Sequence, residues 1–377
     1  MNKAQFIEKL TALLSAQSEA ERGQLIDYYT EMIDDRVEVG LTEEEAVAAL
    51  GEPEALARDF SPAEASLPEA LPAAAADPGA EFVDALREVR AYMRYADILI
   101  RREPLANGAA AQLQFSDPGA FEYRVEGGVL VVTEKPEARR GLFSLDIAIG
   151  GMRLGSSPER KFTLTLAETV PDQLIVETGS GDVTLTDVQA RDLLALSSGS
   201  GDIELSRCGC GGRVDIATGS GDASGDHLNI RDDLKVKSAS GDIALRHVRV
   251  RNLRMNTASG DVEISGLDCE SLSASGASGD LTLNDVESAA TIACATTGGD
   301  IKLSHPIAPQ IHLNSTSGDI RAELENRAGG YSLDAHTLVG SIRLPKRWTP
   351  PEGAAEKARL VARTTSGDIH VSIAQDA

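Results

Sequence analysis

Apolar and polar residues alternate through most of the chain beyond residue 170, and the alternation restarts at a nearly constant interval. Each restart follows a Gly-Asp pair, as in TGSGDVTL at 178–185 and SGSGDIEL at 198–205. From Gly181 to Gly318 these pairs lie 19 or 20 residues apart, and a longer gap precedes Gly367. The Gly340-Ser341 pair falls in that gap and is interpreted as a degenerate copy. A fixed period of this length is the sequence signature of a solenoid.

The alternation around each glycine predicts two short strands per repeat. Apolar residues recur two and four positions after the glycine, and seven and five positions before it. A period of two is that of a strand with one buried face. We therefore expect two strands joined at the Ser-Gly-Asp corner, a second turn that returns the chain, and one aliphatic core shared by the stacked coils. The predicted fold class is mainly β, a single-chain β-solenoid (β-helix) of about ten or more coils of roughly 20 residues.

The residue types at the corner favour a structural role, in which they set the shape of the turn. Glycine adopts positive φ at little cost, and an aspartate side chain can accept hydrogen bonds from its own nearby backbone, as in an Asx-turn. Stacked carboxylates about 4.8 Å apart repel each other by about 0.9 kcal/mol in water, so the ladder needs backbone donors, basic neighbours or cations. The expected structural corner ladder comprises Gly181, Asp182, Gly201, Asp202, Gly221, Asp222, Gly241, Asp242, Gly260, Asp261, Gly279, Asp280, Gly299, Asp300, Gly318, Asp319, Gly367 and Asp368.

Calcium binding is the functional alternative for these aspartates. Repeats-in-toxin β-rolls bind calcium through tandem nonapeptides, G-G-x-G-x-D-x-U-x. Here the period is about twice as long and a single aspartate marks each coil. A structural role is therefore favoured, and neither a metal site nor a cofactor is expected.

Two segments depart from the repeat. GDASGDH at 221–227 loses the inward apolar pair and contains a second Gly-Asp pair, which indicates a local bulge or kink, with a ligand notch as the alternative. RHVRVRNLR at 246–254 concentrates basic residues on an acidic chain. A solvated face that neutralises the aspartates is favoured there over a patch that binds an anion or a partner. The arginines of that patch are Arg246, Arg249, Arg251 and Arg254.

Degenerate coils are expected over 81–170, ahead of the regular Ser-Gly-Asp coils at 171–377. YADILIRR at 95–102 resembles SGDIALRH, with Ala96 in place of the glycine. FEYRVEGGVLVVTEK at 121–135 predicts a hairpin around Gly127-Gly128.

Two further segments of the solenoid region leave room for alternatives. Residues 81–95 fit either a strand or an amphipathic capping helix. RLPKRWTPPEG at 343–353 is expected to interrupt or cap the stack through Trp348 and its prolines.

Residues 1–60 have the periodicity of helices rather than strands. Apolar residues from Phe6 to Leu14 recur at helical spacing, and two capping boxes, Ser18 with Glu21 and Thr42 with Glu45, indicate further helix starts. Residues 61–80 are rich in proline and alanine and are expected to form a semi-rigid linker.

The helical segment resembles a known bacterial family. The matching features are the Tyr28-Tyr29/Glu31 step, the GLTEEEA sequence at 40–46 and Leu50-Gly51-x-Pro53. They identify residues 1–60 as similar to the HAAS-type helical signalling domain. The resemblance implies a signalling or docking role and hence a protein partner, which is membrane-associated or part of a signalling pathway.

The Ser-Gly-Asp repeats also resemble a family. Over about 83–377 they are similar to the bacterial putative-adhesin family of such β-strand repeats. The resemblance implies a β-solenoid and a connection with the cell envelope, and it supplies no catalytic residues.

Charge and composition limit the partners. Acidic residues outnumber basic ones 59 to 36, for a formal net charge of −23, which argues against nucleic acid. No membrane span or secretory signal is expected, so the default location is cytoplasmic, with envelope association as the alternative. The four cysteines lack zinc-ligand spacing, and Cys294 falls in an inward row, as a small buried apolar residue would.

No constellation of catalytic residues is recognised, and the six histidines are scattered along the chain. The leading hypothesis is a non-enzymatic scaffold in envelope-linked signalling or stress response, with the helical domain docking a partner and the solenoid binding protein or envelope polymer. The first alternative is a structural or adhesive surface protein that self-associates through the solenoid ends. The second is a polysaccharide-active β-helix enzyme.

Overall fold

The computed structural model describes residues 3–13, 81–105, 108–135, 160–325, 330–345 and 358–373. The chain divides into two compact units, residues 1–74 and 75–377, each considered by itself. In the first unit, helix α1 (Lys3–Leu13) forms where helical spacing was predicted, and Phe6 is fully buried. The later helices predicted before residue 60, the linker at 61–80 and the Trp348 segment lie outside the described residues.

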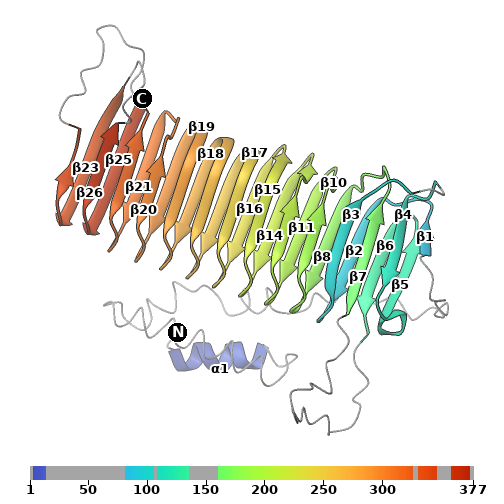
Figure 1. Ribbon diagram of the computed structural model, residues 1–377. Helices are drawn as coiled ribbons and strands as arrows, with labels where there is room; N and C mark the ends of the chain where they lie inside the picture. Colours follow the sequence, from blue (N-terminus) through green and yellow to red (C-terminus); the bar gives the residue numbers. More distant parts are fainter. Residues whose placement is uncertain are drawn as a thin grey trace, which may run out of the picture. The chain divides into compact units, whose positions relative to one another are not determined.

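The second unit is a stack of parallel coils, as Figure 1 shows. One regular coil contains β12 (Ile203–Ser206), β13 (Gly209–Cys210) and β14 (Arg213–Thr218). We call these three parts the first, second and third segments of a coil. The expectation of two strands per coil was incomplete, because the second turn contains a short strand of its own. Its inward residues, seven and nine positions after the corner glycine, form a further buried row.

Each segment pairs in parallel with its copies in the neighbouring coils. The first-segment row runs through β7 (Lys161–Leu166), β3 (Asp97–Arg102), β9 (Val183–Thr186), β12, β15 (Ala223–Ile230), β17 (Ile243–Thr257), β18 (Val262–Gly276), β19 (Leu281–Thr296), β20 (Ile301–Ser304), β22 (Ile320–Leu324), β26 (Ile369–Ile373) and β24 (Ile342–Arg343). Strands β17, β18 and β19 continue through all three segments of their coils.

The third-segment row keeps the same order of coils. It runs through β6 (Val129–Glu134), β2 (Glu88–Met93), β8 (Gln173–Thr178), β11 (Leu193–Ser198), β14, β16 (Asp233–Ser238), β17, β18, β19, β21 (Gln310–Ser315), β25 (Ala358–Ser366) and β23 (Tyr331–Val339). The second-segment row includes β10 (Gln189–Ala190) and β13 before it continues in β15. Inward aliphatic side chains from all three rows form one continuous core.

Near the N-terminal end of the stack, spatial order differs from chain order. The coil of β2 and β3 lies between the coil of β6 and β7 and the coil of β8 and β9. The likeness of YADILIRR to the repeat predicted a degenerate coil here, and residues 88–102 form one. Its position directly on the first regular coil was not predicted. The alternative left open for 81–95 is resolved in favour of strands, since β1 (Glu81–Val83) and β2 occupy this segment.

At the C-terminal end of the stack, the spatial order of the coils also differs from their order in the chain. The coil of β25 and β26 inserts between that of β21 and β22 and that of β23 and β24. Gly340 is thus a degenerate corner, as interpreted from the sequence, but the order of the corners in the stack differs from their order in the chain. Gly340 lies beyond Gly367, because the last strands of the chain turn back into the stack.

Antiparallel strands cover the outermost coil at the N-terminal end. The predicted hairpin forms, with β5 (Phe121–Glu126) paired to β6 through a turn at Gly127-Gly128. A 3-10 turn (Pro118–Ala120) precedes β5. Strand β4 (Ala111–Phe115) pairs with β7, and β1 pairs with β4. Among the described strands, β23 and β24 at the opposite end pair on one side alone.

Aromatic rings gather beneath these covering strands. The ring of Phe115 stacks on that of Phe162, with 5.3 Å between the centroids, and on that of Phe121, at 5.0 Å. Large rings therefore close the core at this end, where the regular repeat with its aliphatic rows is absent.

Candidate functional site

The corner aspartates form a continuous hydrogen-bonded ladder along the stack. The Oδ1 atom of each accepts the backbone N–H of the corresponding residue in the next coil, at 2.7–3.0 Å. The ladder starts at Asp97 and ends at Ser341. An Asx-turn within each coil was expected. Instead, the side chain joins one coil to the next, so backbone donors stabilise the stacked carboxylates.

Glycine is required at the corners because neighbouring coils approach each other closely there, not because the backbone has a positive φ. None of those from Gly181 to Gly367 in the Ser-Gly-Asp pairs has φ in the left-handed region, which corrects the expectation from the sequence. A Cβ atom built on Gly260 would lie 2.0 Å from the carbonyl oxygen of Gly241, and the other corners give 1.9–2.3 Å. Any side chain here would collide with the backbone of the preceding coil.

A hydroxyl group three residues before the glycine completes the corner. The Ser198 Oγ atom accepts the N–H of Gly201 at 2.8 Å and donates to the carbonyl oxygen of Gly181 at 3.3 Å. This buried serine or threonine recurs in most coils, and sequence analysis missed it although its spacing from the glycine is constant. Its members include Thr178, Ser198, Thr218, Ser238, Thr257, Thr296, Ser315 and Thr364.

Left-handed backbone occurs instead at the second turn, six residues after each corner glycine from Gly181 to Gly299. The non-glycine residues there have φ between 51° and 57°. They form a column in neighbouring coils: Asp187, Arg207, His227, His247, Asp285 and His305, with Gly266 between His247 and Asp285. Oppositely charged members interact, and Arg207 binds both carboxylate oxygens of Asp187 at 2.7 and 2.8 Å.

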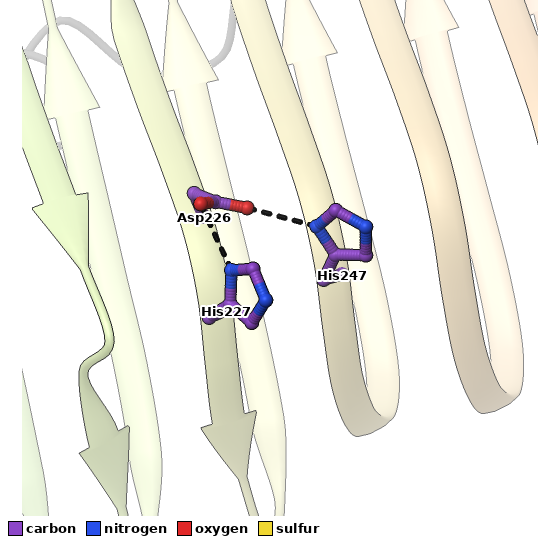
Figure 2. Close-up of side chains that lie close together, drawn as sticks. All are labelled: Asp226, His227 and His247. Carbon is purple, nitrogen blue, oxygen red and sulfur yellow. Dashed lines mark hydrogen bonds and ion pairs between the residues drawn. The ribbon is translucent and has the colours of Figure 1, made fainter.

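Figure 2 shows a cluster formed by two members of this column, His227 and His247, with Asp226, the residue before His227. The Nδ1 atoms of His227 and His247 lie 2.9 and 3.0 Å from separate oxygens of Asp226. The two rings are 4.5 Å apart between centroids. Contacts with His247 and then His227 hold the pKa of the Asp226 carboxyl below its usual range. Each residue offers a ligand atom within 4.8 Å of the others, so the cluster has the donor atoms of a metal site.

The sequence signal for this cluster was the irregular segment at 221–227. The bulge or kink considered for it does not occur, because β15 keeps continuous register with β12 and β17 on either side of the turn. The missing inward side chain at Gly225 is replaced by Leu228, whose Cδ1 atom would lie 2.7 Å from a Cβ on that glycine. The second Gly-Asp pair places Asp226 beside the two histidines.

The four arginines of the proposed partner patch are spread around one coil. Arg246 lies on the first segment, Arg249 on the second, Arg251 directly after the second and Arg254 on the third. Arg249 binds Asp268 at 2.9 Å and Arg251 binds Asp232 at 3.1 Å. Arg246 pairs with Glu263 at 3.7 Å. The structure brings Arg249 and Arg251 together and separates Arg246 and Arg254 from them.

Arg254 lies next to a different surface feature, a shallow groove on the third-segment face, because it is in register with the groove residue Lys235. The groove, of about 290 Å³, crosses β8, β11, β14 and β16. One row across it is Glu177, Ser197, Ala217 and Lys237, and the parallel row is Ile175, Ala195, Asp215 and Lys235. Three small residues, Ala195, Ser197 and Ala217, thus form most of its floor, with Asp215 beside them and larger side chains at the ends. Arg254 pairs with Lys235 in register and extends the basic wall of the groove.

The stacked parallel coils, joined from Asp97 to Ser341 by the same hydrogen-bonded corner, define a single-chain β-solenoid. The chain belongs to the Toastrack DUF4097 family, whose model matches residues 120–232 and 228–377. A HAAS model matches residues 5–59, which confirms the resemblance found in the helical segment.

Several solved structures are similar to this chain at low identity. A putative adhesin from Bacteroides fragilis is 12% identical, with 78% of this chain and 95% of that chain covered and a TM-score of 0.37. A putative lipid binding protein from Parabacteroides distasonis is 14% identical, with 79% and 96% covered and a TM-score of 0.41. A putative cell adhesion protein from Clostridium sporogenes is 11% identical, with 78% and 98% covered and a TM-score of 0.22.

No curated protein matches this chain. Within the described residues, no helix combines the length and apolar character needed to cross a membrane.

Proposed function

We propose that this protein is a non-enzymatic binding scaffold in envelope-linked signalling or stress response. The observation that supports this most directly is the groove on the third-segment face, where Ala195, Ser197 and Ala217 leave space beside Lys235 and Lys237. A groove that crosses several strands suits an extended ligand, since solenoids bind along their long faces. Lys235 and Lys237 make one end of the groove basic and would attract an anionic group there, although Glu177 and Asp215 also line the groove.

The ligand that fits this groove best is a linear anionic polymer of the cell envelope. Negatively charged groups would lie against Lys235, Lys237 and Arg254, and the uncharged backbone of the polymer would lie over the small side chains of the floor. Exposed ion pairs of this kind are screened by salt, so binding weakens as ionic strength rises.

Co-sedimentation of the full chain with purified bacterial cell-wall material tests the groove. We expect the double variant Lys235→Glu/Lys237→Glu to sediment far less than the unmodified chain. Lys302→Glu is the matched control, because Lys302 is an exposed lysine on the first segment of a distant coil. Equal sedimentation of all three proteins would contradict the assignment of the groove.

The HAAS segment is proposed to dock a protein partner of a signalling pathway. A photo-crosslinking amino acid in place of the exposed Ala12 of α1, in the full chain and in native cells, should capture a regulator or membrane-associated protein. The same amino acid in place of Glu204, on the outward side of β12, provides the control. Capture of the same proteins from both positions would count against a docking role for α1.

Self-association through the C-terminal end of the stack is a second candidate function. Leu338 and Val339 on β23 are 70% and 68% exposed, and Ile342 and Leu344 next to them are 41% and 42% exposed. Apolar side chains on a strand paired on one side favour edge-to-edge contact. Sedimentation velocity should then show larger species that Leu338→Lys/Val339→Lys abolishes. A monomer at every concentration would exclude this candidate.

A further inference from the structure

The Asp226–His227–His247 cluster has donor atoms and spacing that suit a metal ion. The two Nδ1 atoms lie 2.9 and 3.0 Å from the Asp226 carboxylate oxygens. In a tetrahedral zinc site with bonds near 2.1 Å, ligand atoms are about 3.4 Å apart. Separation of each nitrogen from its oxygen by about half an ångström would therefore make room for the ion. Figure 2 shows both Nδ1 atoms directed at the carboxylate.

The backbone holds the two rings in this arrangement. His227 and His247 both have left-handed backbone, with φ of 54° and 51°, at the same position of neighbouring coils. The pairs Asp226–Arg246 and Leu228–Val248 fix the register on either side of the two histidines. Because these backbone positions are set by the stack, little backbone freedom is lost when an ion binds.

The site is accessible to ions from solvent. The side chains of Asp226, His227 and His247 are 48%, 59% and 61% exposed. The next residue of the column is Gly266, and even a Cβ there would come no closer than 3.5 Å to His247. The ring of His247 is therefore not covered by a side chain of that residue.

The two carboxylates of the column itself each have a single ion-pair partner among the described residues. Asp187 binds Arg207, whose guanidinium is a permanent cation, and Asp285 pairs with one imidazole, His305, at 3.3 Å. Among the described histidines and carboxylates, Asp226, His227 and His247 are the group that meets the spacing of a metal site. The candidate metal site is therefore confined to the two neighbouring coils that contain these three residues.

We propose that Asp226, His227 and His247 bind a divalent transition-metal ion, such as Zn²⁺, through the two Nδ1 atoms and the carboxylate. Two imidazoles and one carboxylate favour such ions over Ca²⁺ and Mg²⁺, which take oxygen ligands. Coordination positions facing solvent would be filled by water or by a donor from a binding partner. The proposal is independent of the groove, which lies on the third-segment face.

Titration of the untagged full chain with ZnCl₂ near pH 7.5 tests the site by calorimetry. We expect one Zn²⁺ per chain and no heat with MgCl₂. His247→Asn should weaken Zn²⁺ binding by more than about tenfold. Asparagine tolerates left-handed backbone, so the turn should be kept. His305→Asn is the matched control on the same column and should bind Zn²⁺ normally.

Two further measurements keep the test decisive. Asp226→Asn replaces His247→Asn if that variant loses its circular dichroism spectrum, and the same loss of binding is expected. In long-range ¹H–¹⁵N spectra of the histidines, Zn²⁺ should move the Nδ1 resonances of two rings. Absence of binding by the unmodified chain, or undiminished affinity in the His247→Asn and Asp226→Asn variants, would overturn the proposal.

Discussion

The Oδ1 atom of Asp242 accepts a 2.7 Å hydrogen bond from the backbone N–H of Asp261, one coil further along the stack. Asp261 does the same for Asp280 at 2.8 Å. The repeated geometry of the corner is thus a property of neighbouring coils rather than of one turn. Each aspartate contributes an acceptor to the next coil while its own N–H is satisfied by the coil before.

Two replacements of Asp261 should distinguish the effect of its hydrogen-bond acceptor on stability from the effect of its charge. Asp261→Asn keeps an oxygen that can accept the N–H of Asp280, so its stability should stay close to that of the unmodified chain. Asp261→Ala removes the acceptor and should cost about 1 kcal/mol, the net value of such a bond. Urea unfolding followed by circular dichroism measures both variants. An equal loss of unfolding free energy in the Asp261→Asn and Asp261→Ala variants would show that the charge, not the acceptor, stabilises the corner.

Gly260→Ala should be more harmful than either aspartate variant. Its Cβ would lie 2.0 Å from the carbonyl oxygen of Gly241, so the coils must separate locally. We expect a loss of about 1–3 kcal/mol, as for overpacked interiors. Gly298→Ala is the control, because its Cβ would meet the carbonyl oxygen of Ala277 at an ordinary 3.5 Å. If the two variants unfold at the same urea concentration, close approach is not what requires glycine at the corner.

The sequence period was enough to predict the coil, the inward rows and the corner. It could not show why the corner needs glycine, because Gly260 meets an atom 19 residues earlier in the chain, and only the register of the stack brings them together. The short second segment was missed for another reason. With only two inward positions, such as Cys208 and Cys210, it does not show a recognisable alternation by itself.

The order in which the coils stack at the two ends could not be predicted from the sequence either. A degenerate coil such as that of β23 and β24 has the same alternation whichever neighbour it packs on, so chain order was assumed. The Asp226 cluster was only partly visible. Asp226 was noted as part of an irregular segment, whereas His227 and His247 are related by one period of the repeat and would have been found by aligning the second turns.

The four cysteines should be unreactive in the folded protein. All are buried, and burial raises the pKa of the Cys208 and Cys269 thiols to about 11 and that of Cys294 to about 12. The thiolate is the reactive form, and it is scarce at about pH 8 when the pKa is this high. Iodoacetamide should therefore label the cysteines only after unfolding in urea, as measured by mass spectrometry. Ser197→Cys on the groove floor provides a labelled control, and labelling of Cys294 at a similar rate would contradict the structure.

Glu134 should give the N-terminal end of the stack a distinct acid sensitivity. Its fully buried side chain accepts the N–H groups of Arg94, Tyr95 and Ala96 and binds Arg160 at 2.7 Å. Burial alone would raise the pKa of Glu134, but these contacts outweigh it and lower the pKa below its ordinary value. The ionised form therefore stabilises the fold above the pKa of the unfolded chain. That contribution is lost as pH falls through the lower pKa of the folded state.

Comparison with Glu134→Gln isolates this effect from the other acidic groups. The variant keeps the size of the side chain but loses the charge beside Arg160, so at pH 7 it should be less stable by about 3 kcal/mol. The difference should shrink below about pH 4, where the unmodified chain begins to lose the same charge. Glu122→Gln, at an exposed position paired with Lys135, should differ little from the unmodified chain at either pH. Urea midpoints for the three proteins at both pH values measure the difference, and a Glu134→Gln deficit that stays constant in acid would show that Glu134 is not the group that titrates.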